Sequence, residues 1–300
     1  MLIDTDPGVD DALALLAACG TPGLAVDSIT TVAGNVPVSL ATVNVFRLLA
    51  LARPQPPPVV AAGAAHPLAQ PLRTATDYHG RDGLGDLGDW PPVAPALAPE
   101  GAVSVMLAAA RRHAAALTLV ALGPLTNVAL AIAEDPAAMR GIGRVIAMGG
   151  AVDVVGNVTP DAEFNFHVDP EAAARVLAAG LTLDLVPLDA TRQVVLERAA
   201  LEAALAAVPG AAAERVRRFT TRSFGVDHAR GTRGMVLHDP LAVGLALDPS
   251  LATWEPARLA VGGDGATRRV GGAPNVRLPR AVDSPRVLRV FLEALCRACS

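Results

Sequence analysis

The chain has 300 residues, of which 52% are hydrophobic, and this is enough to bury a large core in one α/β domain spanning residues 1–300. Its formal net charge is -4 and every basic residue is Arg, so the basic stripe typical of nucleic-acid-binding proteins is missing. No apolar run reaches the roughly 18 uninterrupted residues of a membrane span, and the three Cys form no disulfide framework. We therefore expect a soluble, cytoplasmic protein with neither nucleic acid nor a membrane as a partner.

The first predicted element is a short strand that leads through a turn into a helix. Leu2-Ile3 ends the strand, Pro7-Gly8 turns the chain, and residues 9–18 have the composition and apolar spacing of a helix. Carboxylates cluster where the strand ends: Asp4, Asp6, Asp10 and Asp11. Open parallel α/β sheets bind their ligands at that end, and crowded oxygen ligands without Cys favour Ca²⁺ or Mg²⁺. The alternative is that these acids only cap the helix.

Residues 24–32 predict a second buried strand, which ends at Ala33-Gly34-Asn35 and brings Asn35 to the same edge of the sheet. Taken alone, Asn35 is more typical of a turn former than of a ligand contact. A third strand starts at residue 59. The long segment 63–100 then has little periodicity and is dense in Pro, Gly and Asp. A loop of this length in a compact domain is usually functional or mobile.

The rest of the chain continues the alternation of helices and strands. The predicted elements are helix 101–114, strand 117–122, helix 125–133, strand 145–147, strand 183–186, helices 196–207 and 211–224, strands and turns over 253–279, and a final helix 284–297. This order predicts an open, mostly parallel sheet with a Rossmann-like core, flanked by helices, with the active site at the carboxyl ends of the strands.

Two later segments carry further polar groups. Asp169-Pro170 is a typical helix start, so Asp169 is interpreted as a structural cap. Glu163 and Asn165 are separated by one residue, and in an extended segment both side chains point the same way, which suits two hydroxyls of one sugar. Residues 226–234 are rich in Gly and Arg and are expected to line the mouth of the site.

The motif Asp4-Thr5-Asp6-Pro7-Gly8-Val9-Asp10-Asp11-Ala12 resembles the N-terminal signature of the inosine-uridine-preferring nucleoside hydrolases. Members of that family are calcium enzymes that cut the N-glycosidic bond of ribonucleosides. Further segments are similar to motifs of the same family: Ala33-Gly34-Asn35, Tyr78 to Gly85, Gly123 to Asn127, Met148-Gly149-Gly150, Glu163-Phe164-Asn165 and His238-Asp239. The resemblance extends over residues 2–241.

The resemblance implies a calcium (Ca²⁺) ion held by Asp6, Asp11, Asp239 and the main-chain oxygen of Leu122. It makes Asp6 the base that takes a proton from water, and His238 the group that protonates the departing base. The substrate contacts that it implies are Asp10, Asn35, His79, Met148, Asn157, Glu163, Asn165 and Asp239. It also implies a homodimer or homotetramer that acts on ribonucleosides in salvage or catabolism.

One departure from the family concerns the nucleobase. Relatives commonly place a Tyr near the base from the region of residues 226–234, but the only Tyr of this chain is Tyr78. The base preference is therefore left open, with His228 or Arg230 as possible substitutes.

Two other functions are weighed against the hydrolase. Haloacid-dehalogenase-like phosphatases also begin with Asp-x-Asp after a strand and use Mg²⁺, but they need a basic residue, usually Lys, and the chain has none. A non-catalytic nucleoside-binding protein could share the scaffold. The intact set of acidic residues and His238 argues for turnover instead.

Overall fold

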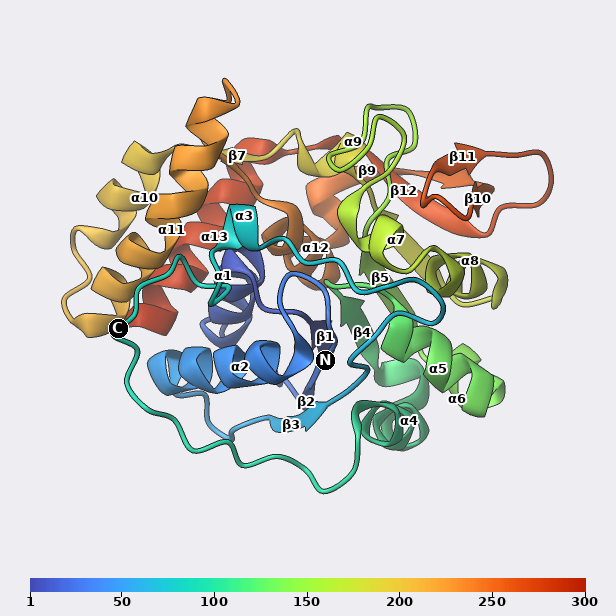
Figure 1. Cartoon of the computed structure of the whole chain (residues 1–300), viewed down its shortest axis with the longest axis horizontal. Helices are drawn as coiled ribbons and strands as arrows, with labels where there is room; N and C mark the ends of the chain where they lie inside the picture. Colours follow the sequence, from blue (N-terminus) through green and yellow to red (C-terminus); the bar gives the residue numbers. More distant parts are fainter.

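The computed structural model describes residues 1–300 and is built around one eight-stranded sheet with the order β3-β2-β1-β4-β5-β6-β12-β9 (Figure 1). All neighbouring strands are parallel except β9, which runs antiparallel to β12 at one edge. The strands are β1 Leu2–Thr5, β2 Ser28–Thr31, β3 Val59–Ala62, β4 Thr118–Ala121, β5 Arg144–Met148, β6 Leu183–Val186, β9 Ala252–Ala257 and β12 Val276–Val282. Two small ribbons pair β7 (Val195–Leu196) with β8 (Met235–Val236), and β10 (Leu259–Val261) with β11 (Thr267–Arg269).

Helices cover both faces of the sheet, and the alternation of residues along the strands explains how. Ile3 and Val120 point into the larger hydrophobic core, whereas their neighbours Leu2 and Leu119 point into the second core on the other face. The first face is covered by α1 Val9–Cys19, α2 Val38–Ala52, α10 Arg198–Leu205, α11 Ala211–Ala229, α12 His238–Leu247 and α13 Ser284–Cys299. The second is covered by α4 Ala102–His113, α5 Thr126–Glu134, α6 Pro136–Arg140 and α8 Pro170–Ala178.

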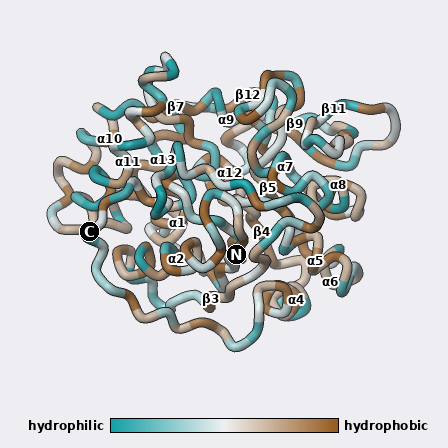
Figure 2. Tube along the Cα trace, in the orientation of Figure 1, coloured by the Kyte–Doolittle hydropathy of each residue, from teal (hydrophilic) through white to brown (hydrophobic).

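The hydropathy pattern agrees with this layering. In Figure 2 several helices, α2 and α4 among them, change between hydrophobic and hydrophilic colours along their length, as expected for helices that bury one face. No helix combines the length and the apolar character that crossing a membrane requires. The expected open, mostly parallel α/β sheet is confirmed.

Several predicted boundaries were wrong. The second strand covers only Ser28–Thr31 instead of residues 24–32. Helix α11 does not end at Phe224 but continues through Gly225 to Ala229, so residues 226–229 of the expected loop are helical. The long loop contains the short helix α3 (Thr76–His79). Residues 164–168 form α7 (Phe164–Val168), so Glu163 and Asn165 do not lie in an extended segment.

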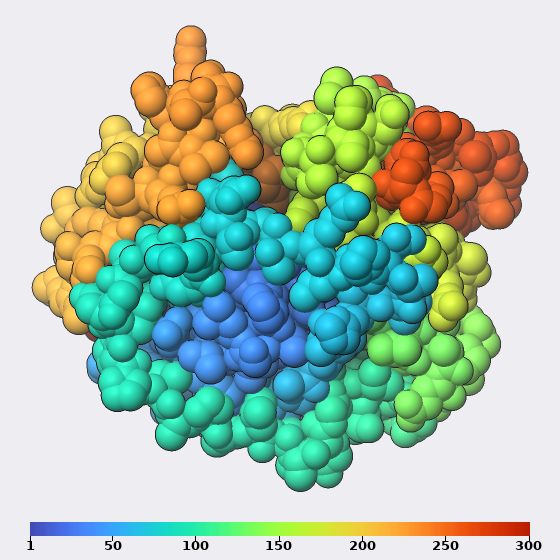
Figure 3. Space-filling model, in the orientation of Figure 1, coloured from blue at the N-terminus to red at the C-terminus, as the bar shows by residue number.

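The long loop after β3 first leads to α3 at the carboxyl ends of the strands and then passes around α2 to reach α4 (Figures 1 and 3). Trp90 anchors it, because its ring stacks on Phe219 of α11 with a centroid distance of 6.5 Å. The guanidinium groups of Arg47 and Arg215 lie 5.5 and 4.9 Å from the Trp90 ring. Asp89 adds ion pairs to α11 through Arg215 and Arg218. These contacts fix the loop on α11, the helix that α3 also contacts through Tyr78 and the carbonyl of Asp77.

Candidate active site

A cavity of about 520 Å³ lies at the carboxyl ends of the central strands. It is visible as a hollow between the long loop, the loop that follows β5 and the end of α11 (Figure 3). Of the site residues expected from the sequence, the following line it: Asp10, Asn35, His79, Leu122, Met148, Asn157, Glu163, Asn165, His238 and Asp239. Asp6 and Asp11 do not line it and are fully buried. The structure therefore gathers residues from the first strand to α12 in one place.

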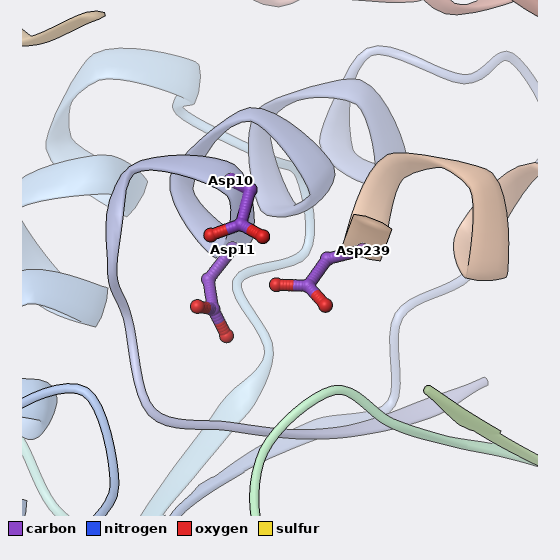
Figure 4. Close-up of side chains that lie close together, drawn as sticks. All are labelled: Asp10, Asp11 and Asp239. Atoms are coloured by element: carbon purple, nitrogen blue, oxygen red, sulfur yellow. The ribbon is translucent and has the colours of Figure 1, made fainter. Parts of the chain in front are cut away.

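Three carboxylates meet at the cavity floor and directly behind it. Figure 4 shows Asp10 and Asp11 projecting from the first turn of α1 and Asp239 from the first turn of α12. One carboxylate oxygen from each lies within 4.8 Å of the others. The strand-turn-helix motif and the α12 start, far apart in sequence, thus supply a single acidic cluster.

The neighbouring Asp6 belongs to the same acidic environment without being part of this three-residue cluster. Its Oδ2 accepts a 2.6 Å hydrogen bond from the backbone N–H of Asn35, whereas its buried Oδ1 has no partner. Gly34 and Gly123 pack closely against the Asp6 side chain. A Cβ atom on Gly34 would lie 2.1 Å from one carboxylate oxygen of Asp6, and a Cβ atom on Gly123 would lie 2.4 Å from the other. The absence of a side chain at both positions therefore makes room for the carboxylate.

Burial and mutual repulsion disfavour ionisation of these acids. Burial raises the pKa of Asp10 to about 8, and the charge of Asp11 adds to this shift. Burial also raises the pKa of Asp6 and of Asp239 well above the usual range, with neighbouring carboxylates as a further cause. Such a group of carboxyls is stable as anions only beside a positive charge.

The donor set fits a hard divalent cation. Asp6 Oδ1 and Asp10 Oδ1 are buried oxygens without hydrogen-bond partners, and both belong to the acidic environment described above. Buried polar atoms normally have partners, so such oxygens are expected where a ligand binds. The Leu122 carbonyl lies at the cavity wall and accepts a 2.7 Å hydrogen bond from Asn165 Nδ2, which leaves one lone pair for another contact. Carboxylates and a carbonyl are the ligands of Ca²⁺ or Mg²⁺.

Glu163 and Asn165 lie at the start of a short helix and not in the extended segment that was expected. Glu163 is the N-cap of α7, and its carboxylate accepts backbone hydrogen bonds from Asn165, Phe166 and Gly150. The side-chain amide of Asn165 donates to the carbonyls of Leu122 and Met148. Because α7 starts at Phe164, the argument from an extended segment was wrong, although both residues line the cavity. Asp169 caps α8, as expected.

Two histidines in the cavity wall are held neutral. The Nδ1 atom of His79 accepts a 3.0 Å hydrogen bond from the backbone N–H of Val9. Burial, followed by the neighbouring His238, lowers the pKa of His79 to about 3. Burial and the charge of Arg192 lower the pKa of His238 to about 4. At neutral pH both rings therefore act as hydrogen-bonding groups rather than as cations.

Tyr78 is a cavity residue that the sequence analysis did not assign to the site, whereas Asp227, Arg230 and Thr232 line the cavity from residues 226–234, the segment expected at its mouth. The Tyr78 hydroxyl donates a 2.7 Å hydrogen bond to Asp227 Oδ2, and the Arg230 guanidinium lies 5.6 Å from the Tyr78 ring centroid. Tyr78 directly precedes His79, an expected substrate contact, and this neighbourhood in the sequence could have identified it as a site residue. His167 also lines the cavity, from α7.

Comparisons with known proteins agree with this arrangement. The family model described as inosine-uridine preferring nucleoside hydrolase matches residues 1–289. The chain is 33% identical to a probable uridine nucleosidase of Arabidopsis thaliana, over 98% of this chain and 97% of the relative. It is 38% identical to a pyrimidine-specific ribonucleoside hydrolase of Salmonella enteritidis, over 84% of this chain and 81% of the relative.

Solved structures show the same fold. A purine-preferring ribonucleoside hydrolase from Gardnerella vaginalis superimposes with a TM-score of 0.94 and 28% identity, covering 99% of this chain and 98% of its own. The plant nucleoside hydrolase PpNRh1 gives a TM-score of 0.90 and 33% identity, covering 98% of each chain. With the family motifs gathered around one cavity, the chain belongs to the inosine-uridine preferring nucleoside hydrolases and is an N-glycosyl hydrolase, not a phosphatase.

Proposed function

We propose that the protein hydrolyses the N-glycosidic bond of ribonucleosides to free base and ribose in a calcium-dependent reaction. The observation that carries this proposal is the cavity itself. Its floor contains the carboxylates of Asp10 and Asp239, with Asp11 behind them, and its wall contains the neutral imidazoles of His79 and His238. The breaking bond needs water on one side of the anomeric carbon and a hydrogen-bond donor at the leaving base on the other.

In this proposal the cation is Ca²⁺ and its ligands are Asp6, Asp11, Asp239 and the Leu122 carbonyl. When bound, such an ion offsets the crowded negative charge and makes nearby water more acidic. Asp6 accepts the proton of the attacking water, a role for which its unpartnered Oδ1 is free. Asp10, beside Asp11 and Asp239, binds the ribose hydroxyls.

The sugar and base contacts divide between the two sides of the cavity. Asn35, Asn157, Glu163 and Asn165 orient the ribose, with Met148 at its side. His238 donates to the departing base. Tyr78, His79 and Asp227 form the polar wall against which the base rests. Since relatives include both a pyrimidine-specific and a purine-preferring enzyme, this wall is where we expect the base preference to be set.

As part of the same proposal, the protein is a cytoplasmic homodimer or homotetramer in nucleoside salvage or catabolism. The family resemblance supports this assignment. Light scattering coupled to gel filtration tests the oligomer, and a monomeric mass would contradict it.

The decisive experiment measures ribose release from inosine, adenosine, guanosine, uridine and cytidine. Activity is expected to disappear after chelation and to return with CaCl₂. Asp239→Asn is expected to lose at least about 100-fold in rate. Asp135→Asn changes the half-buried cap of α6, which does not line the cavity, and should retain wild-type activity. Nucleoside binding by calorimetry without any ribose release would instead support the non-catalytic alternative. Activity indifferent to chelation would reject the cation.

A further inference from the structure

Thr191 is a buried polar residue that none of the steps above uses. It is the last residue of α9 (Leu188–Thr191), is fully buried and does not line the cavity. Its hydroxyl oxygen lies 2.8 Å from Nδ1 of His238. The contact joins the segment after β6 to the first residue of α12, so it links two elements that meet only in the folded chain.

The direction of this hydrogen bond follows from the partners that Thr191 has. Two other buried threonines, Thr42 and Thr220, donate to the carbonyl four residues earlier in their helices. Thr191 makes no such bond, and Nδ1 of His238 is its only side-chain partner. A buried hydroxyl needs an acceptor, and a ring nitrogen accepts only when it carries no proton.

The proton of the imidazole is therefore on Nε2. This nitrogen lies on the side of the ring opposite Nδ1, away from buried Thr191, and makes no hydrogen bond within the protein. His238 lines the cavity, so Nε2–H is the group that remains to face a bound molecule.

We propose that Thr191 is a positioning residue, which holds His238 as the Nε2–H tautomer and turns that N–H toward the departing base. The inference rests on the proposed function, in which His238 donates to the base. It goes further by naming the group that decides which ring nitrogen can donate.

His79 offers a comparison within the same wall. Its Nδ1 accepts from the backbone N–H of Val9, and an amide N–H can only donate, so the proton of His79 is on Nε2 as well. Both histidines of the cavity are thus held in the same tautomer. His79 is held by a backbone group and His238 by a side chain, and only the second can be removed by substitution.

The kinetic test compares two leaving groups. Thr191→Val keeps the shape of the side chain and removes its hydroxyl. We expect kcat for inosine or uridine to fall about 10- to 100-fold, with little change in KM, whereas cleavage of nitrophenyl riboside, whose leaving group needs no proton, stays near the wild-type rate. Thr191→Ser should restore most of the loss. Thr220→Val, at a buried threonine bonded only to its own helix, should leave both substrates unaffected.

A second readout does not depend on activity. Long-range ¹H–¹⁵N NMR of protein labelled with ¹⁵N-histidine should show an unprotonated Nδ1 of His238 in the wild type and in Thr191→Ser. The same spectrum of Thr191→Val should show a mixture of the two tautomers. A wild-type His238 protonated at Nδ1 overturns the inference, as do equal losses on both substrates or no loss at all. A wild-type protein that cleaves no ribonucleoside refutes the proposed function instead, and the NMR result still decides the tautomer.

Discussion

The hydroxyl of Tyr78 donates a hydrogen bond of 2.7 Å to Oδ2 of Asp227 in the wall of the cavity. The bond joins α3, in the long loop after β3, to the last turn of α11. Burial raises the pKa of Tyr78, and the nearby Asp227 carboxylate raises it further, so the phenol keeps its proton at neutral pH. Two segments that are 149 residues apart in the sequence therefore form one polar surface beside the histidines.

This surface predicts an effect on substrate discrimination. Asp227→Asn keeps an oxygen that can accept from Tyr78, and we expect its KM values to stay near those of the wild type. Asp227→Leu leaves the Tyr78 hydroxyl without an acceptor and should change the ratio of kcat/KM between uridine and inosine by about 10-fold, since one unpaired buried group costs about 1–3 kcal/mol. Steady-state kinetics on both substrates measures this ratio. If Asp227→Leu leaves the uridine-to-inosine ratio of kcat/KM unchanged, the nucleobase does not bind beside Tyr78 and Asp227.

The acidic cluster predicts that calcium stabilises the fold. A ligand that binds only the native state at 100 times its Kd adds about 2.7 kcal/mol to the free energy of unfolding. We expect CaCl₂ to raise the Tm of the wild type, and to do so much less for Asp239→Asn, which removes one member of the cluster. Asp135→Asn is the control. Equal shifts in all three proteins, measured by circular dichroism, would show that the cation binds at another place.

The metal-free protein should become less stable as the pH rises. The folded-state pKa is about 7 for Asp4 and about 8 for Asp10, mainly because both are buried, and an unfolded Asp titrates near 3.9. Between these values the native state binds more protons than the unfolded state, so the free energy of unfolding falls by about 1.4 kcal/mol per pH unit for each such proton.

The measurement is Tm in EDTA from pH 5 to pH 8, where a decline is expected. Added CaCl₂ should oppose the decline most strongly at pH 8, because a cation competes with protons for the same oxygens. A Tm in EDTA that rises over this interval would mean that the carboxyls are already ionised in the folded chain.

Much of this site could be predicted from sequence because its parts are local motifs. Asp4 to Ala12 form a strand, a turn and a helix start within one short segment, so the placement of Asp10 and Asp11 follows from local rules. The start of α12 at His238 is equally local. The start of α1 faces the cavity because β1 is a central parallel strand of the sheet. The start of α12 follows β8, which lies in the small ribbon with β7 and not in the main sheet, so its meeting with α1 depends on long-range packing.

The contacts that sequence analysis missed depend on long-range packing. The predicted helix ended at Phe224, but α11 continues to Ala229, and Asp227 in its last turn accepts a hydrogen bond from Tyr78 of α3. No local pattern links these two residues. The expectation that Glu163 and Asn165 lie in an extended segment failed for a different reason. Glu163 caps the backbone N–H groups that follow it, and a helix therefore starts within the expected loop.

The anchoring of the long loop by Trp90 gives a final prediction, in which stability and substrate binding separate. Trp90→Ala removes the stack on Phe219 and the contacts with two guanidinium groups, at a cost of about 2 kcal/mol. Since the same loop carries Tyr78 and His79 into the cavity, we expect KM for nucleosides to rise as well as Tm to fall.

Trp254, the other Trp of the chain, is the matched control. It is also half-buried, and the guanidinium groups of Arg144 and Arg277 lie 5.6 and 5.1 Å from its ring, but it belongs to β9 at the far edge of the sheet and does not line the cavity. Trp254→Ala should therefore lower Tm by a similar amount and leave KM unchanged. If both variants raise KM equally, the effect comes from general destabilisation. A rise confined to Trp90→Ala shows that the loop needs its anchor on α11 to hold its side of the cavity.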